Sequence, residues 1–330
     1  MKKILILSGG YSKEREISLQ TADSVYKELK KNKKYKLLVK EPNGNFVKEL
    51  RKFKPHLVLN LLHGRYGEDG YIQARLESEK VKYTHSGVLS SSLAIDKELS
   101  KKIFMKHNIL TPSYFKFIFK KNLQKKKIIQ KIKKKFNFPV VIKPINEGSS
   151  VNVYICNQSN FIKNLLKLKN YGEILIEKFI PGREIQVAIL GKKKLGAIEL
   201  KPKREFYDYE AKYNPKAKTE HIIPVNISKK NYEKVNSIAL KAHNLLKCRG
   251  VTRADFRLYN NKFYLLEINT QPGMTKLSLV PEIAKFRGME FGDLVEWIVK
   301  DASINRWKNY ISHYFFLWFW FCFPHLIQMV

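Results

Sequence analysis

The strongest constraint on the fold is a pair of strand-length apolar segments near the C-terminus, joined by a short turn. They occupy residues 251–258 and 263–269, and Asn260-Asn261 lies between them. Apolar runs separated by such a turn predict an antiparallel β-hairpin. Within it, Asp255 lies on the first strand and Glu267 and Asn269 lie on the second. The last two are two positions apart, so their side chains share one face of the strand.

These three side chains offer oxygen ligands next to a cation, Arg253. Mg²⁺ takes few protein oxygens and completes its shell with water and phosphate, so the pattern fits a magnesium site that carries phosphates. The plainer interpretation is a hairpin with ordinary solvated polar residues. The sequence Asn-Thr-Gln-Pro-Gly-Met-Thr at 269–275 favours the site over that alternative.

The composition indicates a folded protein with an unusual charge. The 330 residues are 44% hydrophobic, enough for two or three domains with buried cores, and the net charge is +34. Such a charge could attract nucleic acid, an anionic membrane or an anionic substrate. The lysines are scattered and no nucleic-acid-binding motif accompanies them, so we favour a lysine bias of the surface and expect no nucleic-acid partner.

The cysteines and the N-terminus favour a reducing cytoplasm. Cys156, Cys248 and Cys322 are far apart and form no Cys-x-x-Cys pair, which argues against a disulfide framework or a zinc site. The apolar stretch at residues 4–7 is too short for a signal peptide and reads instead as a first strand.

The order of segments predicts three domains. Residues 1–93 alternate strands and helices, which is typical of a parallel sheet covered by helices. Residues 94–182 form a second unit that contains a lysine-rich stretch, 116–135, read as a helix because its isoleucines recur at helical spacing. Residues 183–303 form a third unit, in which strands precede helices and which contains the hairpin.

Residues 304–330 form an aromatic, apolar tail. Its stretch 310–330 is about long enough to span a bilayer, but it contains Pro324, two histidines and many aromatic residues. A membrane tail, an interfacial segment and a translated end without a selected function stay open, and we favour the last.

A second group of residues is suited to phosphate and nucleotide binding. The loop 146–150, Asn-Glu-Gly-Ser-Ser, exposes backbone N–H groups and hydroxyls between two strands, although such loops are often only turns. Lys143 before the loop and Lys97 earlier in the chain could add cations. The strand 174–179 could present its backbone edge to an adenine ring, and Glu184 could bind ribose hydroxyls.

In order, these segments resemble the ATP-grasp superfamily and, within it, the D-alanine–D-alanine ligase family. The resemblance covers residues 1 to about 300 and rests on six segments taken together. They are residues 9–19, 62–70, 83–89, 143–150, 206–213 and the hairpin through Pro281.

The resemblance implies an α/β protein with an N-terminal Rossmann-like parallel-sheet domain followed by a two-lobed ATP-grasp fold of the α+β type. It also implies ATP and two Mg²⁺ ions as cofactors, with Mn²⁺ as an alternative, two D-alanine molecules as substrates, and a homodimer. Asp255, Glu267 and Asn269 match the metal ligands. The matching ATP-binding positions are Lys97, Lys143, Glu177, Lys178, Ile180, Glu184 and the loop residue Lys212.

The remaining positions match the substrate sites of the family. Glu14 resembles the acid that holds the amino group of the first D-alanine, in a hydrogen-bonded set with Ser149 and Tyr213 that closes the site. His63 belongs to the same region. Arg253 and Gly273 match the groups that face the oxyanion, and Ser278 and Leu279 match the site for the second carboxylate.

The implied reaction joins two D-alanines for peptidoglycan through a D-alanyl phosphate. Two alternatives stay open: a related ligase that uses D-serine or D-lactate as acceptor, and a basic scaffold in which the ligase site is secondary. Two positions depart from the family pattern. Tyr11 stands where a small or basic residue is expected, and Asn152 where glycine is usual.

Overall fold

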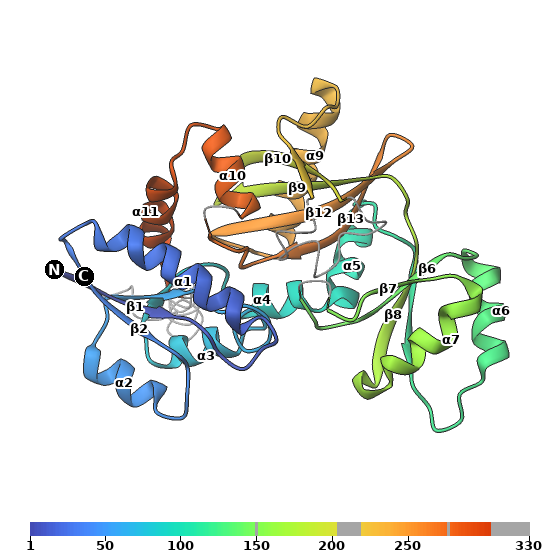
Figure 1. Ribbon diagram of the computed structural model, residues 1–330, viewed down its shortest axis with the longest axis horizontal. Helices are drawn as coiled ribbons and strands as arrows, with labels where there is room; N and C mark the ends of the chain where they lie inside the picture. Colours follow the sequence, from blue (N-terminus) through green and yellow to red (C-terminus); the bar gives the residue numbers. More distant parts are fainter. Residues whose placement is uncertain (149–150, 203–218, 276–277, 305–330) are drawn as a thin grey trace, which may run out of the picture.

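A computed structural model describes residues 1–148, 151–202, 219–275 and 278–304. Three sheets follow one another along the chain, each with its own helices (Figure 1). One parallel sheet is followed by two antiparallel sheets, as the predicted fold class requires. The domain boundaries at 93 and 182 stay a prediction, although each lies between two of these sheets.

The N-terminal sheet is parallel and has the strand order β2-β1-β3-β4. Buried apolar runs such as Ile4–Leu7 are typical of strands covered on both faces. Its elements are β1 (Lys2–Leu7), α1 (Arg15–Lys30), β2 (Tyr35–Lys40), α2 (Phe46–Phe53), β3 (Leu57–Asn60), α3 (Tyr71–Ser78), β4 (Lys82–Tyr83) and α4 (Val88–Ile95). The loops after β1 and β3 meet at the carboxyl edge of the sheet, where the strand order reverses and such sheets bind ligands.

The central sheet is antiparallel and has the order β5-β8-β6-β7. Its elements are α5 (Lys97–Lys106), β5 (Tyr114–Ile118), α6 (Lys125–Lys135), β6 (Val140–Pro144), β7 (Tyr154–Cys156), α7 (Gln158–Lys167), a 3₁₀ turn (Lys169–Tyr171) and β8 (Glu173–Lys178). Helices α6 and α7 cover it at the right of Figure 1 through a core that includes Ile132 and Phe161.

The C-terminal sheet is antiparallel and has the order β11-β10-β9-β12-β13. Its elements are β9 (Arg183–Leu190), β10 (Lys193–Lys201), β11 (Glu220–Ile222), α9 (Lys229–Leu245), β12 (Val251–Tyr259), β13 (Lys262–Asn269), α10 (Leu279–Phe286) and α11 (Phe291–Asp301). One core contains side chains of β9, β12 and β13 together with Phe104 of α5 and Ala239 of α9.

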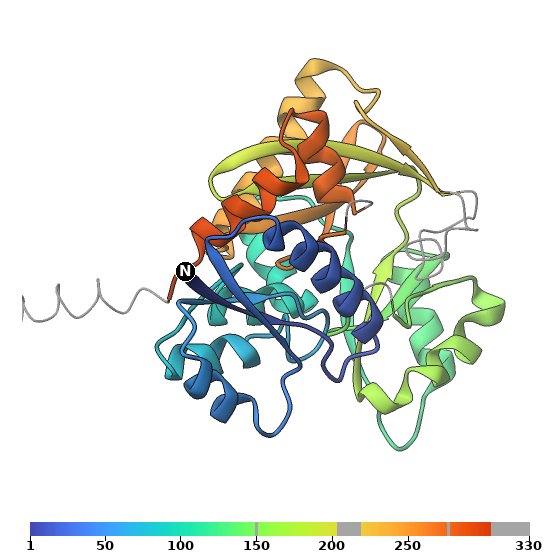
Figure 2. The same cartoon turned by 60° about the vertical axis from the view of Figure 1, so that its left-hand side comes forward.

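A shared core joins the first sheet to the third. It combines Ile4 of β1 and Val25 of α1 with Ile198 of β10, Ile283 of α10 and Val295 of α11. Figure 2 shows α10 and α11 next to α1. The apolar surface buried in this core fixes the position of the first sheet relative to the third, so residues from both sheets can contribute to one site.

Two details of the sequence interpretation are wrong. The stretch 116–135 is not one helix: its first residues continue β5, which pairs with β8, and the helix begins at Lys125. Phe115 is buried and Lys116 exposed, a period-two pattern that the lysine run obscured. The strand expected from Val151 begins at Tyr154, because Asn152 adopts a left-handed φ of 57°.

The prediction for the tail concerns residues that lie outside the described ranges, apart from Ile304. Within residues 1–304, apart from the three gaps, no helix is long and apolar enough to cross a membrane.

Two buried histidines predict acid sensitivity. Burial, aided by repulsion from His63 and Arg249, lowers the pKa of His85 to about 3. Burial likewise lowers the pKa of His243 to about 4. The unfolded chain should take up protons near pH 6.5, where the folded protein does not. The stabilisation is therefore complete above that pH, and it is lost as the pH falls, by about 1.4 kcal/mol per pH unit for each histidine.

We predict that His85→Asn removes the contribution of one histidine from the pH dependence of the free energy of unfolding between pH 6.5 and 5. Urea unfolding measures this as a slope that is smaller by up to about 1.4 kcal/mol per pH unit. Asparagine suits the left-handed φ of 66° at this position, which limits backbone strain. An unchanged slope in the variant would contradict the assignment of His85 as a buried neutral group.

Candidate active site

The β12–β13 hairpin forms as expected. Asn260 and Asn261 both have positive φ, 46° and 57°, as a two-residue turn of this kind requires. The resulting register places Asp255 opposite Glu267, and Arg253 opposite Asn269. The register shifts directly after Asp255, at a β-bulge. The three predicted metal ligands therefore lie at adjacent positions of two paired strands.

Neighbouring polar groups hold the side chains of this triad. The Arg253 guanidinium donates to both carboxylate oxygens of the buried Asp255, at 2.8 and 3.0 Å. The Gln271 N–H donates to Asn269 Oδ1 at 2.8 Å. Lys97 Nζ lies 3.3 Å from Glu267 Oε2 and donates to the Glu147 carbonyl at 2.5 Å. Lys97 thus connects the loop that begins at Asn146 and contains Glu147 and Gly148, called the Gly-Ser loop below, to β13.

The donor set of the triad fits a hard divalent cation. It consists of two carboxylates and one amide oxygen, which are the ligands that Mg²⁺ prefers. Asn269 Oδ1 has a second lone pair besides the one that accepts from Gln271. Within the described ranges no cluster of three His, Cys, Asp or Glu side chains is arranged to hold a metal. A metal here would therefore depend on the amide oxygen and on oxygens brought by a substrate.

A cavity between the central and the C-terminal sheets gathers most of the predicted nucleotide residues. Its empty space, counted together with the open solvent at its mouth, is about 760 Å³. Eight residues named from the sequence line it, namely Lys97, Lys143, Glu177, Lys178, Ile180, Glu184, Asp255 and Glu267. Apolar walls from Val141, Val153, Phe179 and Leu266 complete it. A lining that combines cations and carboxylates with apolar walls suits a ligand with a charged tail and a flat apolar head.

A buried ion cluster forms the wall of this cavity. Glu177 lies between two lysines, 2.9 Å from Lys143 and 3.1 Å from Lys101. Burial raises the pKa of Glu177, but the two lysine charges outweigh burial, and the net shift is downward. Burial lowers the pKa of Lys101 to about 8. Glu177 is thus held as a carboxylate that fixes the Lys143 ammonium at the cavity.

The Gly-Ser loop closely approaches Glu14 of the N-terminal domain. A Cβ added at Gly148 would lie 2.9 Å from Glu14 Oε2. Glu14 is itself buried. The absence of a side chain at Gly148 therefore lets the loop of the central sheet approach Glu14, and the expected set of Glu14 with Ser149 and Tyr213 stays a prediction.

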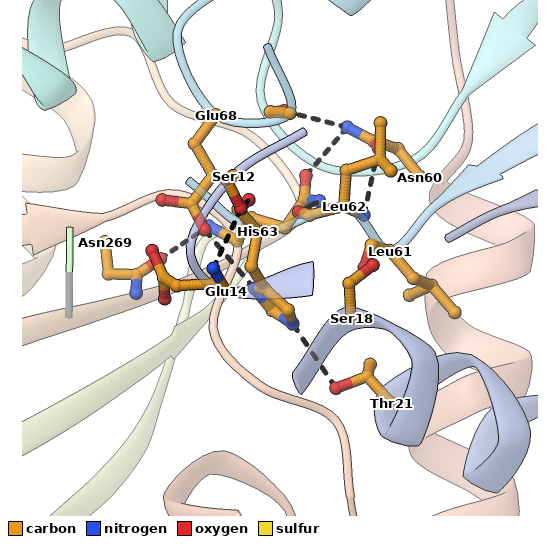
Figure 3. A network of polar contacts seen from close by, with 12 residues as sticks. Ser12, Glu14, Ser18, Thr21, Asn60, Leu61, Leu62, His63, Glu68 and Asn269 are labelled. Atoms are coloured by element: carbon orange, nitrogen blue, oxygen red, sulfur yellow. Dashed lines mark hydrogen bonds and ion pairs between the residues drawn. The ribbon is translucent and has the colours of Figure 1, made fainter. Parts of the chain in front are cut away.

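His63 lies at the centre of a buried polar network (Figure 3). Its Nδ1 is 3.3 Å from Glu68 Oε1 and its Nε2 is 3.3 Å from Thr21 Oγ1. Burial lowers the pKa of His63, but the hydrogen bond and charge of Glu68, the charge of Glu14 and a backbone hydrogen bond with Gln271 outweigh it. The net shift is upward and favours the imidazolium.

A second cavity lies at the carboxyl edge of the N-terminal sheet, and Gly10 and His63 are among the residues that line it. Tyr11, the departure noted in the sequence, stands at its rim with its side chain 74% exposed and its ring edge-on to Tyr66. The tyrosine needs no extra space inside the protein, because most of its side chain lies in solvent.

The two residues matched to the oxyanion lie on different segments, Arg253 on β12 and Gly273 beyond β13, where Gly273 is next to Ser278, a residue matched to the second carboxylate. A Cβ added at Gly273 would be 3.0 Å from Ser278 Oγ, so a larger residue would crowd this hydroxyl. Ser278 directly precedes α10, and its Oγ accepts a hydrogen bond from the Thr275 N–H at 3.0 Å. Leu279 is buried in the shared core, so its side chain serves packing.

Three predicted residues, Ser149, Lys212 and Tyr213, lie outside the described residues. The structure adds others that carried no predicted role: Lys101 beside Glu177, Glu68 and Thr21 beside His63, and Gln271 beside Asn269. Glu68 and Gln271 fall inside the quoted motifs, but Thr21 on α1 and Lys101 on α5 lie outside all of them.

Comparison with known proteins agrees with this geometry. The family model described as "D-ala D-ala ligase C-terminus" matches residues 103–300. A D-alanine–D-alanine ligase of Pelagibacter ubique (strain HTCC1062) is 65% identical over 305 residues, which cover 92% of this chain and 99% of that protein. The chain belongs to the D-alanine–D-alanine ligase family.

Other members of the ligase family match over nearly the same length. The D-alanine–D-alanine ligase of Wolbachia pipientis wMel is 43% identical over 318 residues, 94% of this chain and 97% of its own. A crystal structure of the D-alanine–D-alanine ligase from Bacillus anthracis complexed with ATP superimposes with a TM-score of 0.78 at 29% identity, covering 91% of this chain and 97% of that one. The resemblance in sequence and the ATP-grasp fold are thereby confirmed.

We predict that Glu177→Gln destabilises this member of the ligase family by about 3–5 kcal/mol, because two buried lysines lose their counter-charge. The matched control is Glu173→Gln on the same strand, whose carboxylate pairs with Lys116 at 3.2 Å but is exposed. The control should cost about 1 kcal/mol at most. Urea unfolding at pH 7 measures both; equal losses would contradict the role of Glu177 as a buried anchor.

Proposed function

We propose that this chain joins two D-alanine molecules at the described site with ATP as the energy source. ATP-dependent formation of the D-alanyl-D-alanine dipeptide for peptidoglycan is the function of its family. One observation carries the assignment of the site: eight residues expected at nucleotide and metal positions line one cavity, formed by segments from residue 97 to residue 267.

The reaction proposed for the site has two steps. The carboxylate of the first D-alanine attacks the γ-phosphorus of ATP and forms a D-alanyl phosphate and ADP. The amine of the second D-alanine then attacks the acyl carbon, and phosphate leaves as the amide bond forms. Little covalent work falls to the protein, which must position the reactants and stabilise developing charge.

Each group of side chains has one part in this scheme. Lys97 and Lys143 face the phosphates from the cavity wall, and Glu184 faces the ribose. Glu14 and His63 hold the first D-alanine, and Ser278 receives the carboxylate of the second. Arg253 and the Gly273 N–H stabilise the oxyanion. The proximity of Gly148 to Glu14 and the position of Ser278 beside Gly273 support these roles.

Several parts of the proposal rest on the resemblance. Lys212 would reach the phosphates, Ser149 and Tyr213 would close the site over Glu14, and Lys178, Ile180 and Leu279 would contribute backbone or packing contacts. A homodimer and a cytoplasmic location also belong to the proposal. Closure over the site would exclude water, which hydrolyses an acyl phosphate.

Asp255, Glu267 and Asn269 would hold two Mg²⁺ ions, or Mn²⁺ in their place. The ions, when bound, neutralise phosphate charge and polarise the transferred phosphoryl group. The hard oxygen donors of the triad support this choice.

The direct test incubates the purified chain with ATP, Mg²⁺ and D-alanine. We expect D-alanyl-D-alanine, ADP and phosphate in equal amounts. D-serine and D-lactate offered as competing acceptors identify the second substrate. Folded protein that releases no phosphate in response to D-alanine would overturn the proposal.

We predict that Glu267→Gln raises the Mg²⁺ concentration for half-maximal activity about tenfold or more, because a neutral amide replaces a charged ligand. Binding of Mn²⁺ followed by electron paramagnetic resonance should weaken in parallel. The control is Glu220→Gln on β11 of the same sheet, which pairs with Lys201 at 3.6 Å, away from the residues that line the cavity. Equal metal affinity in the two variants would remove Glu267 from the metal site.

A further inference from the structure

Gln271 forms hydrogen bonds through both its backbone and its side-chain amide, although it was not among the predicted site residues. Its backbone N–H donates to Asn269 Oδ1 at 2.8 Å. Its side-chain oxygen accepts from Asn60 Nδ2 at 2.9 Å, and its side-chain nitrogen donates to the Leu62 carbonyl. A backbone group of Gln271 also forms a hydrogen bond with the His63 ring. The side chain is buried, so none of these partners is readily replaced by bulk water.

Asn60, the partner of Gln271, is the last residue of β3 and is fully buried. Its Nδ2 also donates to the Gly67 carbonyl at 3.1 Å, and its Oδ1 accepts from the Leu62 N–H at 3.3 Å. Asn60 therefore shapes the chain on both sides of His63. Figure 3 shows Asn60, Leu62 and His63 side by side in this network.

The Asn60–Gln271 pair joins residues 211 positions apart in the chain. One end, Asn60, is the last residue of β3 and lies just before the loop that carries His63 and Glu68. The other end, Gln271, lies two residues after the end of β13, which carries Glu267 and Asn269. The pair is thus a hydrogen-bonded link between the N-terminal sheet and the strand of the proposed metal site.

We propose that the Asn60–Gln271 pair positions the first-amino-acid site, through Leu62 and His63, relative to the phosphoryl-transfer site on β13. The inference rests on the proposed function. Phosphoryl transfer to a carboxylate needs the two sites in register to within a fraction of an ångström. Asn60 and Gln271 are positioning residues: they set where the carboxylate of the first D-alanine meets the γ-phosphate.

The test variant is Gln271→Met, which nearly conserves volume and keeps the backbone N–H that donates to Asn269. It leaves Asn60 Nδ2 and the Leu62 carbonyl without their side-chain partner. We expect kcat/KM for the first D-alanine to fall about tenfold. The yield of dipeptide per ATP hydrolysed should fall below that of the unaltered chain, because a misplaced acyl group is lost to water. The KM for ATP should stay within about twofold, because Gln271 does not line the nucleotide cavity.

The matched control is Asn236→Leu on α9. Asn236 is a buried amide that donates to the Tyr232 carbonyl at 2.9 Å, away from both substrate regions. This control should lower the melting temperature and leave the dipeptide yield per ATP unchanged. If Gln271→Met does not fold, Asn60→Asp tests the pair from its other end, because it keeps the acceptor for the Leu62 N–H and loses the donor to Gln271 and to the Gly67 carbonyl.

The outcomes are distinct. A lower yield per ATP in a folded variant of the pair supports the inference. A loss of melting temperature with unchanged yield and unchanged KM for D-alanine overturns it and leaves the proposed function intact. An unaltered chain that makes no dipeptide overturns the proposed function and, with it, the inference.

Discussion

The register of the β12–β13 hairpin is the constraint on which the rest of the site depends. The Asn260-Asn261 turn sets it, and it brings Asp255 opposite Glu267 and Arg253 opposite Asn269. A slip of one residue would send the side chains of one strand to the opposite face. The hairpin also lies next to β9, whose pairing with β12 extends over eight residues. The polar site is thus held by a long hydrogen-bonded ladder with a buried core beneath it.

Each neighbouring unit reaches this hairpin through a small number of buried polar contacts. Lys97, on α5, bridges Glu267 and the Glu147 carbonyl, which lies in the loop after β6 of the central sheet. From the N-terminal sheet, Asn60 and Gln271 perform the corresponding task. The shared core through α1, α10 and α11 already holds the first and third sheets together. The Asn60–Gln271 contact therefore sets the relative position of the site residues more than it stabilises the fold. Such an arrangement suits a reaction whose main demand is alignment of reactants.

The sequence predicted best where the signal is local. The hairpin turn needs only two asparagines with positive φ, and the nucleotide residues lie in short segments whose order matches the family. Strand β5 was missed because the lysines after Phe115 resemble a solvated helix, and only pairing with β8 reveals the strand. Gln271 and Lys101 were missed for a related reason. Their partners, Asn60 and Glu177, are far away in sequence, and neither residue type suggests such a contact.

In the proposed reaction the carboxylate of the first D-alanine is phosphorylated before the amide bond forms. The most direct test of this step uses D-alanine with ¹⁸O in both carboxylate oxygens, and mass spectrometry of the phosphate released during dipeptide synthesis. Attack of the carboxylate on ATP transfers one labelled oxygen to each phosphate, so we expect singly labelled phosphate in proportion to dipeptide. Dipeptide formed together with unlabelled phosphate would contradict the account.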